Sequence, residues 1–179
     1  MLIVVSALAV VNTPSPGREL DPTSLGDHLD RLYRAAVGLC GSHADAEDLV
    51  QETFVAVLRR PRLLRSDDDV GYLLRVLRNT FYSRYRAESR RPRATDLGEH
   101  AELPEPRPGT APEVMVASRE VLAAVAALPE PYREAVAAVD LAGLSYREAA
   151  RALETREGTI MSRLHRGRAQ VAKSLGYTS

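Results

Sequence analysis

The chain is poor in the residues that cross-link small proteins or bind metals. Its 179 residues include a single cysteine, Cys40, so neither a disulfide within the chain nor a cysteine-ligated zinc site is possible. The four histidines are scattered, at positions 28, 43, 100 and 165, and lack the spacing of a ligand set. We therefore expect no metal and no cofactor. The scarcity of cysteine fits a cytoplasmic location.

Long apolar runs are also missing. Met1 to Val11 are almost wholly apolar, but this stretch is too short for a membrane helix and lacks the positive start of a secretory signal. We expect residues 1–20 to form an extension outside the fold, and we expect no membrane insertion. A phosphate-binding glycine loop, a His-Glu-x-x-His motif and a nucleophile with its base are absent from the sequence, which predicts that the protein is not an enzyme.

Charge is balanced in total but segregated along the chain. Acidic and basic residues number 24 each. Residues 21–69 contain ten acidic and six basic residues, whereas residues 71–93 contain seven arginines and one acidic residue, Glu88. All basic residues except Lys173 are arginine, which suits bidentate contacts to phosphates and bases. This segregation predicts different partners for different surfaces.

Helical periodicity predicts a three-helix unit over residues 21–90. The first helix is expected over about 21–41, the second over about 42–60 and the third over about 70–87. The aspartates at 67–69 precede the third helix, and we interpret them as a solvated helix N-terminus rather than a metal site.

A second helical unit is expected over residues 113–179. Residues 91–112 are rich in proline and acidic residues, which predicts an extended linker. The last two of the four helices beyond it form a predicted helix-turn-helix, in which Ser145 and Glu148 make a capping box and Thr155 caps the second helix. The sequence thus predicts an all-α protein of two small helical domains joined by a flexible linker.

The last helix has an apolar side and a basic side. Ile160, Leu164, Val171 and Leu175 recur with helical spacing and are expected to pack inward. A helix of this diameter fits the major groove of DNA, where its basic side could meet phosphate and base edges. A surface helix with solvated arginines is the alternative interpretation. The basic residues are Arg156, Arg163, Arg166, Arg168 and Lys173.

The third helix interleaves arginines with aromatic residues between Tyr72 and Arg86. Aromatic faces beside cations are what single-stranded nucleic acid requires, because bases stack and phosphates carry charge. In the alternative interpretation, Phe81 and some of the tyrosines belong to the core and the arginines form a solvated face.

Five segments carry a more specific pattern. They are DAEDLVQETF at 45–54, YLLRVLRN at 72–79, LPEPYRE at 128–134, LAGLSYREAA at 141–150 and GTIMSRLHRGR at 158–168. In order and spacing they resemble regions 2.2, 2.3, 4.1 and 4.2 of the sigma-70 family of RNA polymerase initiation factors, in its extracytoplasmic-function (ECF) group. The resemblance extends over about residues 25–175, with region 2 in residues 21–90 and region 4 in residues 113–179.

The resemblance implies a subunit that binds core RNA polymerase, directs it to specific promoters and assists promoter melting. Region 2.2 would dock on the clamp helices of the β′ subunit, and region 4 on the β flap. The residues implied in polymerase binding are Asp45, Glu47, Asp48, Gln51 and Glu52. An anti-sigma factor is a further partner that the resemblance allows. The alternative function is a stand-alone helix-turn-helix regulator that binds duplex DNA.

The resemblance also implies two sets of residues that bind promoter DNA. The loop before the third helix would capture a flipped base of the minus-ten element, and the third helix would hold the melted strand. The minus-ten set is Arg62, Leu63, Leu64, Arg65, Tyr72, Arg75, Arg78, Asn79, Tyr82 and Arg86. The minus-thirty-five set is Arg156, Thr159, Ser162, Arg163, His165, Arg166 and Arg168. Met161 stands where the family usually has a basic residue, and Asp67–Asp69 make the loop unusually acidic, so the promoter sequence is not predicted.

Overall fold

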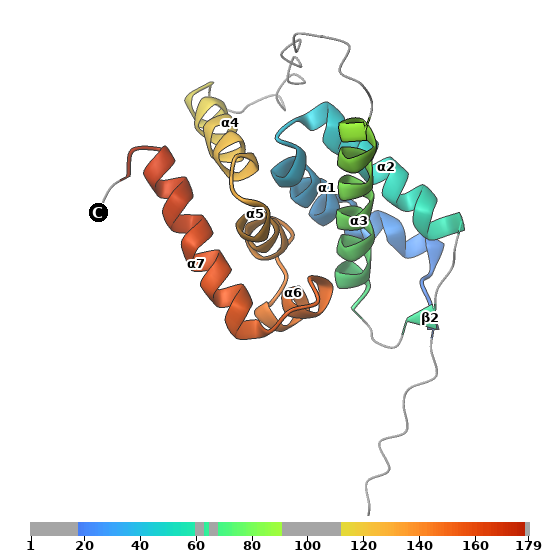
Figure 1. Cartoon of the computed structure of the whole chain (residues 1–179). Helices are drawn as coiled ribbons and strands as arrows, with labels where there is room; N and C mark the ends of the chain where they lie inside the picture. Colours follow the sequence, from blue (N-terminus) through green and yellow to red (C-terminus); the bar gives the residue numbers. More distant parts are fainter. Residues whose placement is uncertain (1–17, 60–62, 65–67, 91–111, 178–179) are drawn as a thin grey trace, which may run out of the picture.

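The described part of the chain is almost entirely helical. A computed structural model describes residues 18–59, 63–64, 68–90 and 112–177. Three N-terminal helices form one unit, and four C-terminal helices form a second unit that lies beside it (Figure 1). The predicted all-α fold with two helical units is confirmed. The predicted linker over 91–112 lies outside the described residues, except for Pro112.

The N-terminal unit consists of a short 3-10 turn and three helices. These are η1 (Pro22–Ser24), α1 (Leu25–Cys40), α2 (His43–Arg59) and α3 (Asp69–Arg90). The carboxylate of Asp21 accepts a hydrogen bond from the Thr23 amide at 2.9 Å and so caps η1. At the other end of α1, Gly41 takes a φ of 72°, which glycine adopts without strain. The leucines buried at the centre of this unit are Leu32, Leu49, Leu73 and Leu77.

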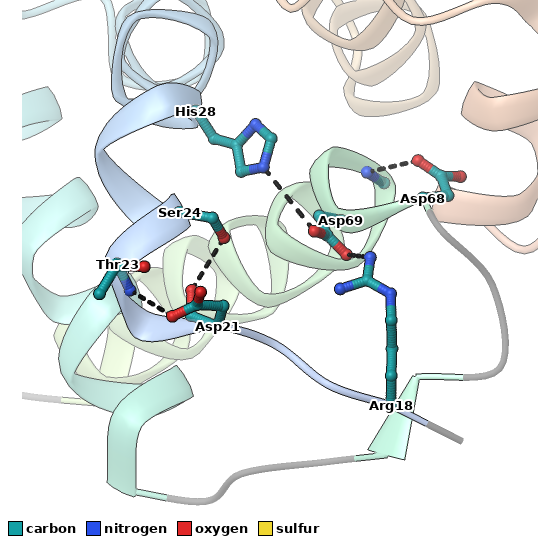
Figure 2. Close-up of polar contacts among 8 residues, drawn as sticks. Arg18, Asp21, Thr23, Ser24, His28, Asp68 and Asp69 are labelled. Atoms are coloured by element: carbon teal, nitrogen blue, oxygen red, sulfur yellow. Dashed lines mark hydrogen bonds and ion pairs between the residues drawn. The ribbon is translucent and has the colours of Figure 1, made fainter. Parts of the chain in front are cut away.

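A two-residue antiparallel ladder joins the start of the described chain to the segment before α3. β1 (Arg18–Glu19) pairs with β2 (Leu63–Leu64), and Leu20 packs against the core. Figure 2 shows the Arg18 side chain reaching from β1 to the Asp69 carboxylate. Residues 18–20 therefore belong to the fold, contrary to the expected extension over 1–20. The pairing strand lies far along the chain, so no local pattern indicated it.

The C-terminal unit consists of four helices and one π-helical turn. These are α4 (Pro112–Ala126), α5 (Glu130–Val136), η2 (Ala137–Leu141), α6 (Tyr146–Ala152) and α7 (Glu157–Ser174). The predicted capping box at the start of α6 is confirmed. The Ser145 amide donates to Glu148 Oε2 at 2.7 Å, and the Glu148 amide donates to Ser145 Oγ at 3.3 Å.

The turn between α6 and α7 differs from the sequence prediction. The residue that caps α7 is Arg156, in an extended conformation and without a side-chain cap hydrogen bond, so the expected cap at Thr155 is wrong. Glu154 takes a φ of 52°, and the Thr155 amide donates to the Ala150 carbonyl at 2.9 Å. Because the turn uses Thr155 to close itself, this residue lies one position too early to cap α7.

The two units are joined by a shared hydrophobic core. Ala138 and Leu144 of the C-terminal unit belong to the same buried cluster as Leu32 of the N-terminal unit. α1 passes η2 closely at Gly38, where an added Cβ would overlap the Leu141 side chain. The missing side chain at Gly38 thus leaves room for Leu141 to pack against α1. The sequence prediction treated the two units separately and did not anticipate this contact.

Candidate functional site

The acidic residues predicted for polymerase binding lie on the exposed face of α2. Their side chains form no hydrogen bond or ion pair with other described residues. Asp48, Gln51 and Glu52 line a shallow hollow together with Val55 and Arg59. Val55 and Leu58 are 45% and 50% exposed. The exposed set is Asp45, Glu47, Asp48, Gln51 and Glu52. This face combines negative charge with exposed apolar area, which suits a protein partner.

The predicted base-capturing loop is described only in part. Arg62 and Arg65 lie outside the described residues, and Leu63 contributes its backbone to β2. Leu64 is 9% exposed and belongs to the buried core, so its side chain is turned away from solvent. Among the four loop residues of the minus-ten set, the structure therefore places only Leu63 and Leu64, which form the strand β2 before α3.

Asp68 caps α3, but Asp68 and Asp69 are not the solvated side chains that the sequence predicted, because they are only 11% and 13% exposed and pair with arginines. Asp68 Oδ1 accepts a hydrogen bond from the Gly71 amide at 2.9 Å, and Asp68 Oδ2 pairs with Arg151 of α6 at 3.2 Å. Asp69 pairs with Arg18 and lies 3.9 Å from His28 Nε2 (Figure 2). Asp67 is outside the described residues. Among the residues that the structure describes, no group of three or more histidine, cysteine, aspartate or glutamate side chains could hold a metal ion.

Two arginines of the predicted strand-holding helix contact the C-terminal unit. Arg75 Nη2 donates to the Arg151 carbonyl at 2.6 Å, and Arg75 Nε lies 3.5 Å from the Ala152 carbonyl, both at the end of α6. Arg75 Nε is also 3.7 Å from the exposed carboxylate of Glu154. The predicted DNA-binding surface of α3 is thus covered in part by α6.

Arg78 forms the most buried ion pair between the two units. Its Nε pairs with Oε1 of Glu134 on α5, a carboxylate that is only 5% exposed. Burial opposes the charge of Arg78, but the hydrogen bond and the negative charge of Glu134 outweigh it and raise the pKa of Arg78. The guanidinium also lies 5.6 Å from the centre of the Tyr82 ring. Arg78 is therefore held by a carboxylate and an aromatic ring within the chain.

The remaining residues of the minus-ten set on α3 differ in exposure. Tyr72 is partly buried and packs against the core, and Tyr82 is partly buried with a raised pKa that burial of its hydroxyl causes. Asn79 and Arg86 are exposed, and the Arg86 Nε donates to the Tyr82 carbonyl at 3.2 Å. Of these four residues, only Asn79 and Arg86 are exposed, and they lie seven positions apart on the same face of α3.

The predicted reading helix has the expected two sides. Ile160 and Leu164 are buried, whereas Ser162, His165 and Arg166 are exposed and their side chains have no hydrogen-bond partner among the described residues. The three are at positions 162, 165 and 166, so they lie on one helical face. Groups with unused donors on one face of a helix are available to a ligand such as DNA.

The other members of the minus-thirty-five set occupy different positions. Arg156 is exposed at the N-terminus of α7, and Thr159 and Arg163 are partly buried. Arg168 forms two hydrogen bonds to the Asp140 carboxylate, at 3.1 and 2.5 Å, and this contact raises the pKa of Arg168. Arg168 is thus already paired, although it remains largely exposed.

Comparison with known proteins identifies the family. The family model described as sigma-70 region 2 matches residues 25–91, and the model described as sigma-70 region 4 matches residues 118–171. The ECF RNA polymerase sigma factor EcfG of Rhodopseudomonas palustris is 33% identical over 145 residues, which cover 80% of this chain and 78% of that protein. The chain belongs to the ECF group of sigma-70 family RNA polymerase sigma factors.

Other relatives of this sigma factor agree. The ECF sigma factor SigE of Mycolicibacterium smegmatis is 36% identical over 146 residues, and the match spans 57% of that protein's length. The solved structure of the sigma factor RpoE in complex with the anti-sigma factor NepR, from Bartonella quintana, superposes with a TM-score of 0.68 at 25% identity. That match covers 88% of this sigma factor and 97% of the RpoE chain.

The structure adds residues to the candidate surfaces of this sigma factor that the sequence prediction omitted. Val55 and Leu58 extend the acidic face of α2, while Glu134 and Asp140 engage the arginines of the two predicted DNA-binding helices. The apolar exposure of Val55 follows from its helical offset from Glu52, which a periodicity plot could have indicated. No helix in the described ranges is both long and apolar enough to cross a membrane.

Proposed function

We propose that this sigma factor binds core RNA polymerase, directs it to specific promoters and assists their melting. The observation that carries the proposal is that the chain combines an exposed acidic face on α2 with arginine-bearing surfaces on α3 and α7. A stand-alone helix-turn-helix regulator, the alternative, would use the α7 surface but has no role for the other two. Acting on polymerase places the protein in the cytoplasm.

Polymerase binding is assigned to the exposed face of α2. Its five polar residues have no partner among the described residues, so binding a basic surface would not require breaking internal ion pairs. Val55 and Leu58 would supply the apolar area that charges alone lack. By resemblance to the family, the partner surface is the clamp helices of β′, and region 4 would contact the β flap.

Promoter recognition is assigned to two helices. α7 would enter the major groove at the minus-thirty-five element with Ser162, His165 and Arg166 toward the bases. Arg156 and Arg168 would lie nearer the phosphates. The segment before α3 and the α3 face would bind the minus-ten element as a single strand with a flipped base, for which stacking and charge must offset a few kcal/mol of unstacking.

The proposal requires neither a metal nor a cofactor, and it requires no reaction catalysed by the chain itself. An anti-sigma factor would be a natural further partner, as in the RpoE and NepR complex. Such a factor would act by binding rather than by chemistry.

Run-off transcription tests the proposal directly. Core polymerase would be assayed on a promoter library with and without the purified full chain, and we expect start sites that appear only when the chain is added. Gel shifts with the chain alone and with polymerase added separate the two functions. Tight sequence-specific binding by the chain alone, together with no chain-dependent transcript, would establish the regulator instead.

A further inference from the structure

A methionine interrupts the polar surface of α7. Met161 is 54% exposed, and it is the one large apolar side chain exposed on this helix, all of which the structure describes. It belongs to neither of the hydrophobic clusters of the described residues, so the packing of the core does not explain it. A single exposed apolar residue has no meaning by itself, and its place on the helix must decide what it does.

Met161 shares a face of α7 with the residues proposed to read base pairs. His165 follows it by one turn, and Ser162 and Arg166 adjoin these two along the same face. The three polar side chains form no hydrogen bond with other described residues. α7 lies at the outer edge of the C-terminal unit, on the side away from α3 (Figure 1). A duplex that meets the polar residues of this face would therefore meet the thioether as well.

The surface beside Met161 is open. Gly158 precedes it by one turn and is exposed, and no atom lies within 4 Å of a Cβ added there. Because glycine has no side chain, the backbone at this point can approach a ligand closely. Both residues lie in the first two turns of α7, and the N-terminal residues of a recognition helix are the ones that contact base edges.

The chemistry of the Met161 side chain restricts what it can recognise in the major groove. Guanine, adenine and cytosine present hydrogen-bond donors and acceptors there, whereas thymine adds an apolar 5-methyl group. A thioether carries no charge and no donor and is only a weak acceptor, so it cannot bind phosphate or pair with the polar edges. Its unbranched chain adapts to irregular apolar surfaces. The group that fits this side chain is therefore the thymine methyl.

We propose that Met161 is a specificity-determining residue that contacts the 5-methyl group of one thymine in the minus-thirty-five element. The inference rests on the proposed function for the name of the element. The contact itself requires only that α7 enters a major groove, which the alternative regulator would also do. Loss of the methyl group should weaken binding about fourfold, as expected for one buried methyl-sized group.

The test removes the methyl group from the DNA and the thioether from the protein independently. Duplexes are first selected from a random library by the full chain with core polymerase. Each thymine of the selected site is then replaced singly by deoxyuridine, which lacks only the methyl group. Binding is measured for the wild type, Met161→Ala and Met161→Gln, after circular dichroism confirms their helical content. Val121→Ala is the matched control, because Val121 is an apolar residue of α4 that is 38% exposed and lies outside the reading face.

The expected results differ between the variants. Deoxyuridine at one position should weaken binding by the wild type and by Val121→Ala about fourfold, and it should leave binding by Met161→Ala unchanged. Met161→Gln keeps a side chain of similar length but presents an amide, which pairs with adenine. This variant should lose its sensitivity to deoxyuridine and prefer adenine at the same position.

Three results would overturn the proposal. They are a wild type for which no thymine is sensitive, an equal deoxyuridine penalty in the wild type and Met161→Ala, and an equal loss by Met161→Ala on all duplexes. The last result would assign Met161 to a contact with polymerase instead.

Failure of the proposed function would be seen at the earlier selection step. If the chain selects duplexes only without polymerase, the proposed function fails, and the deoxyuridine scan on those duplexes still decides the role of Met161. If the chain selects no duplex under either condition, both the proposed function and the Met161 contact are wrong.

Discussion

The carboxylate of Asp68 folds over the backbone of Gly71 at the start of α3. Asp68 Oδ1 accepts the Gly71 amide hydrogen at 2.9 Å, and a Cβ on Gly71 would lie 2.5 to 2.7 Å from the three carboxyl atoms. The cap therefore requires glycine at this position. Because Asp68 also pairs with Arg151, the same carboxylate links the start of α3 to α6.

Gly71→Ala is expected to destabilise the protein despite the higher helix propensity of alanine. The substitution gains up to about 1 kcal/mol in propensity but displaces a cap that typically contributes about 1 kcal/mol, and it adds steric strain. We expect the free energy of unfolding in urea to fall by about 1 kcal/mol. Gly26→Ala, which meets no neighbour, should instead raise it. Equal stabilisation by both variants would show that the Asp68 cap does not form.

Local signals in the sequence predicted the helix boundaries well. Asp21 before η1 and the Ser145–Glu148 pair before α6 act within three residues, so residue type and spacing are sufficient to find them. Thr155 was misassigned because the backbone of the preceding turn, with Glu154 at positive φ, decides where α7 begins. That choice depends on how α6 and α7 pack, which no single cap residue reveals.

The capping box of α6 should make stability depend on pH. Hydrogen bonds from Ser145 lower the pKa of Glu148 below its value in the unfolded chain. The contribution of the Glu148 carboxylate to the free energy of unfolding is therefore fully present above the pKa of this group in the unfolded chain. It is lost as the pH falls through the pKa of the group in the folded protein. Glu148→Gln keeps the hydrogen-bond acceptor and removes the titration, so its free energy of unfolding should fall less than that of the wild type between neutral and acidic pH.

Urea unfolding at about pH 7 and about pH 3.5 measures this difference. Glu120→Gln is the matched control, since Glu120 is exposed and its carboxylate makes no hydrogen bond with another described residue. An acid-induced loss in Glu148→Gln as large as in the wild type would contradict the role of the charged capping box.

Asp48→Arg is expected to weaken association with core polymerase while the fold is retained. Asp48 is exposed and has no internal ion pair among the described residues, so the substitution reverses a charge without breaking a structural contact. We expect co-purification with core enzyme to weaken by about tenfold or more, as for a central interface residue. Asp30→Arg makes the same charge change on the exposed surface of α1 and should bind normally. Unchanged co-purification of Asp48→Arg would remove α2 from the polymerase interface.

Arg166→Ala is expected to weaken promoter binding by the polymerase complex and to relax its specificity. Arg166 is exposed on α7 with no side-chain partner among the described residues, so a base contact would cost about 1–3 kcal/mol when lost. Filter binding on promoter and random duplexes measures both effects. Arg119→Ala, an exposed arginine on α4, should have little effect. An equal loss on random DNA would indicate that Arg166 contacts phosphate.

The sequence predicted which residues form the candidate surfaces, but it did not predict which of them form ion pairs within the chain. Periodicity alone separates the buried Ile160 and Leu164 from the exposed side of α7, and it places the acidic residues of α2 outward. In contrast, Arg78 and Glu134 are 56 positions apart, and Arg168 and Asp140 are 28 apart. Such pairs depend on how helices that are distant in the sequence pack against each other, and local sequence patterns do not predict that packing.

Several of the hydrogen bonds between the two units are directed at peptide carbonyls rather than at side chains. Arg31, Arg34 and Arg75 all donate to main-chain oxygens at the ends of η2 and α6. Every amino acid presents such an oxygen, so mutations among the acceptor positions leave the docking points intact as long as the backbone keeps its course. Substitutions at these acceptor positions would therefore spare the hydrogen bonds, whereas loss of any of the three arginines would remove the bonds that it donates.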